Sequence, residues 1–252
     1  MPARIGVIPG RLYSRIKGAC GSNRLLFREF GEVIVVIEKT NAHRHVALLA
    51  KMFQQRARFF HDRLRWDVQV TDGKERDRYD DEGPVYIVYT DDLRNEVKGS
   101  LRLLPTTGPT LAVDVFSDTL PDAVQLSAPT IWECSRFCLG QNVLADGIEE
   151  IVFTSRVLIA ALGDVAMRAG IESIIGNFDA SKLRLYRRIG CEVEVLGSTS
   201  RYGDPVYLGL HHISETIVRR VWGKLKDDRL ASEVARECVG ANVAKQFDVA
   251  VT

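Results

Sequence analysis

The chain has 252 residues, with 34 Lys and Arg against 33 Asp and Glu, so its formal net charge is +1. A composition that is 46% hydrophobic and 27% charged excludes a wholly disordered or collagen-like chain, and no apolar run approaches the roughly 20 residues that span a bilayer. The near-zero charge argues against an overall basic nucleic-acid binder. We therefore expect a soluble globular protein with no nucleic-acid or membrane partner.

The first 31 residues differ from the rest of the chain in charge. They carry six basic side chains and one acidic one, a net charge of +5, which leaves −4 for the remainder. We predict that residues 1–31 form a basic N-terminal extension without regular structure. Because this segment lacks the continuous apolar core of a secretory signal, we expect the protein to be cytoplasmic.

The five cysteines predict neither a disulfide framework nor a metal site. Their number is odd, they are scattered, and no C-x-x-C pair occurs. Cys134 and Cys138 lie close together, but no His is near them in the sequence. Buried thiols in a reducing compartment are the simpler interpretation.

Regular structure is predicted to begin near Val33, where the β-branched run 33–38 is typical of a strand. Residues 44–64 have helical periodicity, with Arg56 on the same stripe as large apolar residues. Residues 72–82 contain six acids and three bases and are predicted to be a loop.

The second half of the chain alternates strand and helix patterns. The expected elements are a hairpin of 85–90 and 97–105, an irregular connection at 110–130, a central strand at 131–139, a helix at 149–169, a strand at 171–177, a short basic helix at 181–190, closing strands at 191–197 and 205–212, and a C-terminal amphipathic helix. This order predicts an α/β fold: a mixed twisted sheet with helices on both faces.

Several charged residues fall where the pattern predicts burial. Arg56 shares an apolar stripe, Arg102 lies in the strand LRLLP, and both Glu133 and Arg136 lie in the apolar strand IWECSRFCL. Each needs a partner of opposite charge, so structural ion pairs are one interpretation. Together with the acid-rich loop 72–82 they also form a candidate functional site.

Glu133 and Arg136 are three residues apart, which places them on opposite faces of a regular strand. If both line one site, a bulge or a strand end must lie between them.

Read together, these residues form four spaced motifs in a fixed order. The motifs are Arg56-x3-Phe60-x5-Trp66, Glu75-x-Asp77-x2-Asp80, Gly99-x2-Arg102-Leu-Leu-Pro-Thr106 and Glu133-x-Ser135-Arg136-Phe137. The series closely resembles the acyl-homoserine-lactone synthases, the LuxI-type autoinducer synthases of bacterial quorum sensing. The stretches RLRWDV (63–68) and RLLPTTGP (102–109) are also similar to that family. The resemblance covers about 32–215, so we expect a catalytic domain at 32–222 and a helical tail at 223–252.

The resemblance implies a fold similar to the GNAT acyltransferases and a specific reaction. An acyl thioester and S-adenosylmethionine give an N-acyl-homoserine lactone, methylthioadenosine and the free thiol carrier, with S-adenosylmethionine as a substrate and no permanently bound cofactor. Eight positions match the characteristic set of the family with none missing: Arg56, Phe60, Trp66, Asp77, Asp80, Arg102, Glu133 and Arg136.

The expected roles follow from the charges of the substrate. Asp77, Asp80 and Glu133 are expected to form an acidic pocket around the amine, although a carboxylate raises an amine's pKa and so opposes its deprotonation. Arg102 and Arg136 suit the substrate's carboxylate, or pair with the acids to fix the pocket. We expect Glu133, Arg136, Asp77 and Arg102 to be catalytic, without naming a general base. Arg56, Phe60 and Trp66 resemble an N-terminal lid that offers cation–π contacts, while a core position is the alternative for Trp66.

The acyl chain is expected in an apolar tunnel between the strand 131–139 and the unit 149–176. Some family members that prefer 3-oxo chains carry a Thr where this chain has Asn177, which puts a 3-oxo preference in doubt. Plain core packing is the alternative role for most tunnel candidates. These candidates are Phe137, Leu139, Phe153, Leu158, Ile175 and Asn177.

The acyl donor is expected to be an acyl group on acyl carrier protein or on coenzyme A. Four bases on the short helix, Lys182, Arg184, Arg187 and Arg188, could dock an acidic carrier or form a solvated face. Two other functions stay open. A GNAT N-acetyltransferase would need a pyrophosphate-binding Gly run that 139–150 lacks, and a non-catalytic binding relative would not need the intact charged set.

Overall fold

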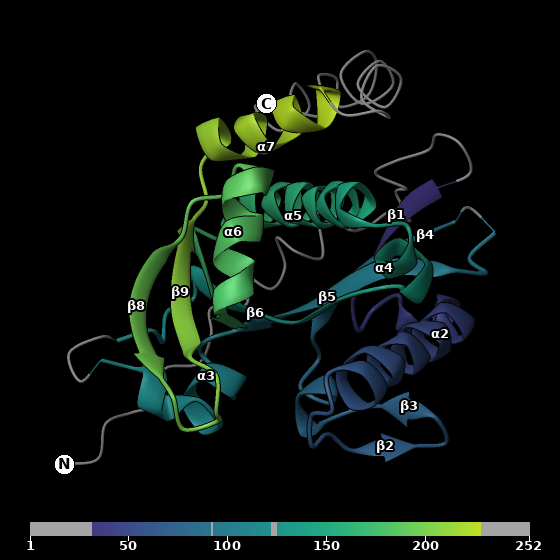
Figure 1. Ribbon diagram of the computed structural model, residues 1–252, viewed down its shortest axis with the longest axis horizontal. Coiled ribbons are helices and arrows are strands. Elements are labelled where there is room, and N and C mark those ends of the chain that lie inside the picture. Colours follow the sequence, from purple (N-terminus) through teal and green to yellow (C-terminus); the bar gives the residue numbers. More distant parts are fainter. Residues whose placement is uncertain (1–31, 92, 122–124, 228–252) are drawn as a thin grey trace.

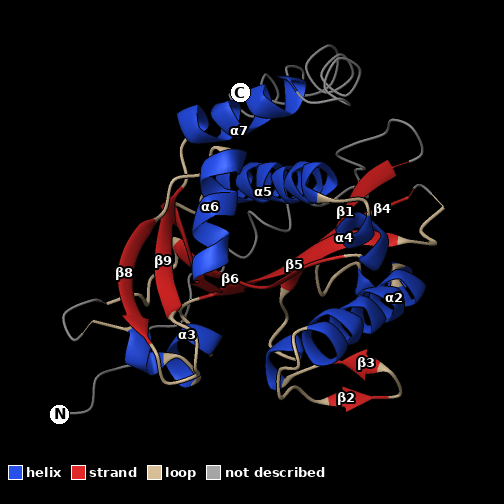
Figure 2. Ribbon diagram, in the orientation of Figure 1, coloured by secondary structure: helices blue, strands red, loops and turns tan. Residues whose placement is uncertain are grey.

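The protein is described by a computed structural model over residues 32–91, 93–121 and 125–227. The predicted extension 1–31 and the tail from 228 onward lie outside the described residues. Seven strands form one mixed sheet in the order β1-β4-β5-β6-β7-β9-β8, and helices cover both of its faces (Figures 1 and 2). The α/β architecture predicted from the sequence is confirmed. The strands of the sheet are β1 (Glu32–Ile37), β4 (Val85–Asp91), β5 (Val97–Pro105), β6 (Ile131–Leu139), β7 (Ser173–Asp179), β8 (Glu194–Thr199) and β9 (Val206–His212).

Two large helices sandwich the sheet. The helix α2 packs on the face of β1 and β4 that carries Val33 and Val88, whereas α5 packs on the opposite face against Ile34 and Ile87. In Figure 1 α5, α6 and α7 lie above the sheet and α2 lies below it. The α-helices are α2 (Val46–Arg56), α3 (Leu111–Asp114), α4 (Gln141–Ala145), α5 (Ile148–Ala169), α6 (Ala180–Ile189) and α7 (Glu215–Asp227).

Helix ends follow local sequence signals. Glu149 and Glu150 lie in the first turn of α5, where acidic side chains interact favourably with the positive end of the helix dipole. The helix ends at Gly170, whose φ of 70° is left-handed and suits glycine. The short helix α6 ends in the same way at Gly190. Within the described part of the chain, no helix combines the length and apolar character needed to cross a membrane.

The predicted helix at 44–64 is present but changes its form partway. It is α-helical to Arg56 and continues as a π-helical segment, Ala57–Arg63. Arg56 is buried as predicted, whereas Val46, the first residue of α2, is 66% exposed. Phe60, within the π-helical segment, is also buried.

The predicted loop 72–82 contains some regular structure. A two-stranded hairpin of β2 (Val70–Thr71) and β3 (Lys74–Glu75) precedes a 3-10 turn, Arg78–Asp80. The 3-10 turn is fixed by a capping box: the Asp77 side chain accepts from the Tyr79 N–H, and the Asp80 side chain accepts from the Asp77 N–H. These bonds fix two acidic side chains, Asp77 and Asp80, on a segment whose structure the sequence pattern did not predict.

The centre of the sheet has a gap that begins close to Glu133. All strand pairs are antiparallel except β6 and β7, which run parallel and pair only over 131–133 with 173–175. Beyond these residues the two strands separate. Strand β6 was predicted to be central, and it is the fourth of the seven strands.

Candidate active site

Three arginines and three carboxylates form one closed network beside β5 and β6. Its members come from five elements, so only the folded chain brings them together. They are Arg56 at the end of α2, Glu75 in β3, Asp77 and Asp80 at the 3-10 turn, Arg102 in β5 and Arg136 in β6. Three positive and three negative side chains give this set a formal charge of zero.

Asp80 lies at the centre of the network. Its Oδ1 accepts from Arg56 Nη1 at 2.8 Å, Arg102 Nη1 at 2.9 Å and the Tyr86 hydroxyl at 2.7 Å. Its Oδ2 accepts from Arg56 Nη2 at 3.0 Å and the Asp77 N–H at 2.9 Å. With five donors and a side chain that is 0% exposed, Asp80 has no oxygen left for a substrate amine. This differs from the expectation that Asp80 binds the amine, and it matches the alternative of arginine–acid pairs that fix the pocket.

The charges of the network stabilise one another. Burial alone raises the pKa of Asp80, but the hydrogen bonds and charge of Arg56, with the charge of Arg102, outweigh it and hold that pKa well below its usual range. Burial lowers the pKa of Arg56, and its bonds to Asp80 and the charge of Glu75 more than reverse that change. Asp80 and Arg56 are therefore both charged in neutral solution.

Asp77 and Arg136 form the edge of the network that solvent can reach. Asp77 accepts from Arg102 Nη1 at 2.5 Å and Nη2 at 3.0 Å, and Arg136 Nη2 lies 2.8 Å from its Oδ2. Their side chains are 17% and 10% exposed, whereas those of Arg56, Glu75, Asp80 and Arg102 are at most 1% exposed. A ligand can therefore contact a cation and an anion side by side at this edge.

A bulge in β6 brings Arg136 to the network. Ser135 of β6 pairs with Arg102 of β5, and the next pair is Cys138 with Ser100. Two residues of β6 therefore lie opposite one residue of β5, which is a β-bulge. Arg136 itself has a left-handed φ of 52°, and its guanidinium contacts Glu75 Oε1 at 3.0 Å. Of the two possibilities that the Glu133–Arg136 spacing left open, a bulge or a strand end, the structure has a bulge.

Glu133 is buried in β6 outside the network. It is 1% exposed, and its Oε2 accepts from the Ala112 N–H at 2.7 Å. Among the described residues its Oε1 has no hydrogen-bond partner. Burial raises the pKa of Glu133, and the Ala112 bond and the charge of Arg102 only partly oppose this. Strand alternation puts Glu133 on the same face of β6 as Ser135, whose hydroxyl accepts from Arg102 Nε at 3.1 Å.

Aromatic rings border the exposed edge of the network. The rings of Phe60 and Trp66 are 5.2 Å apart, and the Arg136 guanidinium lies 5.3 Å from the centre of the Phe60 ring. Phe60 is buried, but Trp66 is 46% exposed, so Trp66 is not a core residue. The two rings give the edge an apolar wall.

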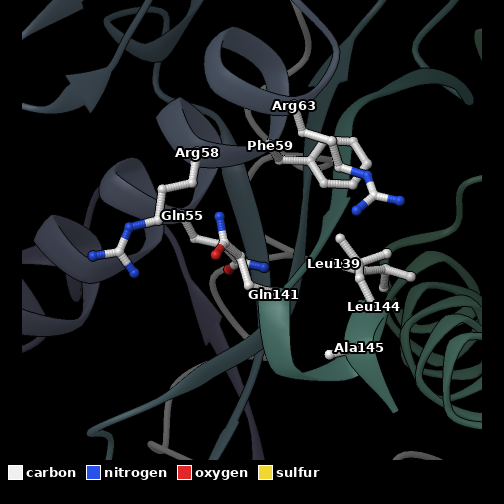
Figure 3. Close-up of a pocket in the computed structure, with 8 residues that line it drawn as sticks. All are labelled: Gln55, Arg58, Phe59, Arg63, Leu139, Gln141, Leu144 and Ala145. Atoms are coloured by element: carbon white, nitrogen blue, oxygen red, sulfur yellow. The ribbon is translucent and has the colours of Figure 1, made fainter. Parts of the chain in front are cut away.

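A cavity of about 230 Å³ lies next to this wall, between α2 with its π-helical extension and the end of β6 with α4. Figure 3 shows side chains from the two sides facing each other across it. Of its lining residues the sequence analysis named Leu139 as a tunnel candidate and included Arg63 in the stretch RLRWDV, whereas the others belong to no motif. The cavity is lined by Gln55, Arg58, Phe59, Arg63, Leu139, Gln141, Leu144 and Ala145.

The six residues expected to line the acyl tunnel are not gathered in one cluster. Phe137, Leu139, Phe153 and Leu158 pack in the core on the α5 face of the sheet. Ile175 belongs to a separate cluster with Ala112, Leu126 and Leu208 on the other face, and alternation along β7 places Asn177 on that same face. The two groups lie on opposite faces of the sheet, on either side of the gap between β6 and β7. Only a tunnel that passes through this gap could contact both groups.

The basic helix α6 presents exposed arginines. Arg184, Arg187 and Arg188 are exposed, while Lys182 lies 3.5 Å from Asp179 at the start of the helix. The other side of α6 is apolar, with Ile189 fully buried and Leu185 packed against the core. The helix therefore carries a basic face toward solvent.

Comparisons with known proteins agree on one family. The autoinducer synthase model matches residues 40–221. An acyl-homoserine-lactone synthase of Rhizobium etli is 39% identical over 165 residues, covering 65% of this chain and 76% of the relative. One of Aliivibrio fischeri is 44% identical over 154 residues, covering 57% and 78%.

Solved structures give the same result. BjaI, a CoA-dependent acyl-homoserine lactone synthase solved with SAM and isopentyl-CoA, is 26% identical with a TM-score of 0.70, over 77% of this chain and 90% of that one. TofI, solved with an inhibitor and MTA, is 30% identical with a TM-score of 0.61, over 75% and 95%. The chain described above therefore belongs to the autoinducer synthase family.

Proposed function

We propose that the protein makes an N-acyl-homoserine lactone from S-adenosylmethionine and an acyl thioester. In one step the amine of S-adenosylmethionine attacks the thioester carbonyl, an N–C bond forms, the C–S bond breaks and the thiol leaves with a proton. In the other step a carboxylate oxygen attacks the γ-carbon, and the C–S⁺ bond breaks to release methylthioadenosine. The observation that carries this proposal is the paired cation and anion at the exposed edge of the network, beside an aromatic wall.

The edge of the network suits the amino-acid part of S-adenosylmethionine. Arg136 offers a guanidinium to the carboxylate, and Asp77 offers a carboxylate to the ammonium group. The rings of Phe60 and Trp66 can face the sulfonium. The buried members Arg56, Glu75, Asp80 and Arg102 hold these groups in place, and fixing the reacting groups supplies much of the rate enhancement for an intramolecular ring closure.

Glu133 is our candidate to accept the proton of the amine. It has one carboxylate oxygen without a partner among the described residues, and its raised pKa makes it more basic than an exposed glutamate. This assignment goes beyond the sequence, from which no base could be named.

The gap between β6 and β7 is the proposed path of the acyl chain. Asn177 lies beside it and donates to Thr119 Oγ1 at 3.1 Å. Because Thr119 in turn donates to the Phe116 carbonyl, the Asn177 NH₂ group must face Thr119. Its Oδ1 is then a buried acceptor with no partner among the described residues. Such an acceptor favours a 3-hydroxyl group on the acyl chain over a 3-oxo group.

The donor is an acyl group on coenzyme A or on acyl carrier protein, and the reaction takes place in the bacterial cytoplasm, where both occur. The BjaI structure holds isopentyl-CoA, which favours CoA, while the exposed arginines of α6 suit an acidic carrier. Charge reversal at Arg184 and Arg187 should raise KM for a carrier-borne acyl group and leave KM for acyl-CoA unchanged. Arg219→Glu, on the exposed face of α7, is the control. An unchanged KM for the carrier-borne group would remove the docking role of α6.

The central experiment follows methylthioadenosine release from purified protein, S-adenosylmethionine and a panel of acyl-CoA and acyl-carrier thioesters. We expect release only when both substrates are present, with a 3-hydroxyacyl donor used better than its 3-oxo counterpart. Methylthioadenosine release with none of the donors would contradict the proposed function. Acetylation of an amine without methylthioadenosine release would instead support an acetyltransferase.

A further inference from the structure

The loop that joins β8 to β9 closes over the irregular connection between β5 and β6. This loop, residues 200–205, lies near α3 in Figure 1. The Tyr202 hydroxyl donates to the Val115 carbonyl at 2.6 Å. The Tyr202 ring also meets the Phe116 ring edge-on, with the ring centres 5.3 Å apart. One side chain of the loop thus binds the connection by a hydrogen bond and by an aromatic contact.

Two further contacts bring β8 and its loop against the same connection. The Arg201 guanidinium lies 3.4 Å from the Asp118 carboxylate. A Cβ at Gly197 would lie 2.2 Å from the Thr119 carbonyl oxygen, so β8 passes this carbonyl with no room for a side chain. The part of the connection that begins with α3, the 111–119 segment, is therefore clamped from outside by β8 and its loop.

The inner side of the 111–119 segment contacts two residues of the candidate active site. The Ala112 N–H donates to Glu133 Oε2 at 2.7 Å, and Thr119 Oγ1 accepts from the Asn177 amide at 3.1 Å. Glu133 and Asn177 each keep one buried oxygen that has no partner among the described residues. Because the bond on the other atom fixes the plane of each side chain, the segment decides where these two oxygens point.

The 111–119 segment depends on outside contacts for its position. A single helical turn such as α3 is not stable by itself in water. Leu111 and Ala112 are buried, whereas Val113 and Val115 are 49% and 41% exposed. Apolar burial therefore holds the start of the segment, and the contacts of Tyr202 hold the part that follows.

We propose that Tyr202 is a positioning residue for lactone synthesis, which orients Glu133 and Asn177 through the 111–119 segment. Tyr202 is 46% exposed and acts from outside the site. A displacement of about 1 Å in a group that meets the substrate is enough to slow a reaction substantially. The inference rests on the proposed function for the roles of Glu133 and Asn177, but the link between Tyr202 and Glu133 can be measured without turnover.

The first test is the steady-state rate of methylthioadenosine release by the full chain. Tyr202→Phe removes the bond to Val115 and keeps the ring, so kcat should fall roughly two- to tenfold. Tyr202→Ala removes both contacts and should lower kcat further. KM for S-adenosylmethionine should stay unchanged, because the charged network holds Asp77 and Arg136. Asp204→Ala, at an exposed position of the same loop, is the control. A wild-type kcat in both Tyr202 variants would overturn the inference.

The pH profile separates positioning from a simple loss of folded protein, which lowers the rate equally at every pH. Burial raises the pKa of Glu133, and the Ala112 bond and the charge of Arg102 oppose that rise. Of these, only the bond depends on the segment. Tyr202→Ala should therefore move the acidic limb of the kcat/KM profile to higher pH. It should also weaken the preference for 3-hydroxyacyl over 3-oxoacyl donors, since the bond to Asn177 loosens. An acidic limb that does not move to higher pH would contradict the inference.

A double-mutant cycle tests the link without turnover. Glu133→Gln, Tyr202→Ala and the double variant are compared with the wild type by urea unfolding at neutral pH. Effects at distant sites that share no partner add, whereas coupled sites do not. The stability gained from Glu133→Gln should be larger in the Tyr202→Ala background, where the charged carboxylate has lost its donor. Additive effects would refute the inference. If the cycle shows coupling but the wild type makes no lactone, the proposed function fails and the link between Tyr202 and Glu133 stands.

Discussion

Three guanidinium groups can be buried in this protein because three carboxylates bind them in return. Asp80 alone accepts five hydrogen bonds, so removing its charge would leave Arg56 and Arg102 without a full set of partners. Breaking a buried pair on one side costs far more than the intact pair contributes to stability. Replacing Asp80, Arg56 or Arg102 alone should therefore destabilise the protein more than replacing all three together.

Asp80→Asn should lower the free energy of unfolding by about 3–5 kcal/mol. Asp81→Asn is the matched control, because the Asp81 side chain is 77% exposed and pairs with an exposed Arg76. That change should cost less than about 1 kcal/mol. Urea unfolding of both variants at neutral pH measures the contrast, and equal losses would show that the central network has no special role in stability.

The stability difference between the wild type and Asp80→Asn should depend on pH. Because the pKa of Asp80 is lower in the folded than in the unfolded protein, its contribution is complete above the unfolded value of about 3.9. It is lost as the pH falls from there through the folded value. The difference in stability between wild type and Asp80→Asn should therefore shrink below about pH 4.

Glu133→Gln should lose turnover and gain stability. The pKa of Glu133 is raised in the folded protein, so the wild type loses stability as the pH rises above the unfolded value of about 4.3. Glutamine keeps an oxygen for the Ala112 N–H and carries no charge. The variant should match the wild type in acid and exceed it at neutral pH in a series of melting curves. Full activity in a folded variant would remove Glu133 from the site.

At the scale of elements, the local geometry of β5 and β6 positions the site. The extra residue in β6 directs Arg136 into the network, and the neighbouring strand must approach closely at Gly99. A Cβ at Gly99 would lie 2.8 Å from Leu158 Cδ1 and 3.2 Å from the Cys138 carbonyl oxygen. Any larger residue at position 99 would clash with its neighbours close to the bulge. This close packing explains why a glycine is part of the motif.

Gly99→Ala should lower the free energy of unfolding by about 1–3 kcal/mol, because the added methyl group overpacks the junction of β5, β6 and α5. Gly108→Ala is the control, since its nearest neighbour would be 3.8 Å away. Chemical unfolding compares the two variants. If Gly99→Ala were as stable as the control, the close approach of β5 and α5 would not limit this position.

At the scale of the whole molecule, α7 packs as part of the main core. Val221 and Leu225 of α7 are buried in the same cluster as α5, and Val218 would contact a Cβ at Gly163 at 2.8 Å. The sequence analysis placed the start of a separate tail at residue 223. Helix α7 runs through that position to Asp227.

Leu225→Ala should lower the free energy of unfolding by about 2–5 kcal/mol if α7 is an integral part of the core. Arg219→Ala, on the exposed side of the same helix, should change it by less than about 1 kcal/mol. Thermal melting measures both. A melting temperature for Leu225→Ala equal to that of the control would mean that residues beyond 222 act as an independent tail.

The sequence was sufficient to predict the strands of the mixed sheet, its long helices and the family, but not the short elements β2, β3, α3 and α4. Apolar periodicity and glycine stops are local properties, so they predicted α5 and α6 directly, and the spaced charged motifs identified the family. The unusual spacing of Glu133 and Arg136 indicated a bulge or a strand end between them, and a bulge is present. These features depend on residues close to one another in the chain.

Only the tertiary structure decided which of these charges meet and which stay exposed. Sequence reasoning put Asp80 in contact with substrate, whereas five donors from four residues saturate it. It gave Glu75 no role of its own, although Glu75 joins Arg56 to Arg136. It also passed over Tyr202, since a tyrosine in a loop carries no signal until the fold brings it against another segment. Which charges pair depends on contacts between residues far apart in the chain, and no local pattern encodes it.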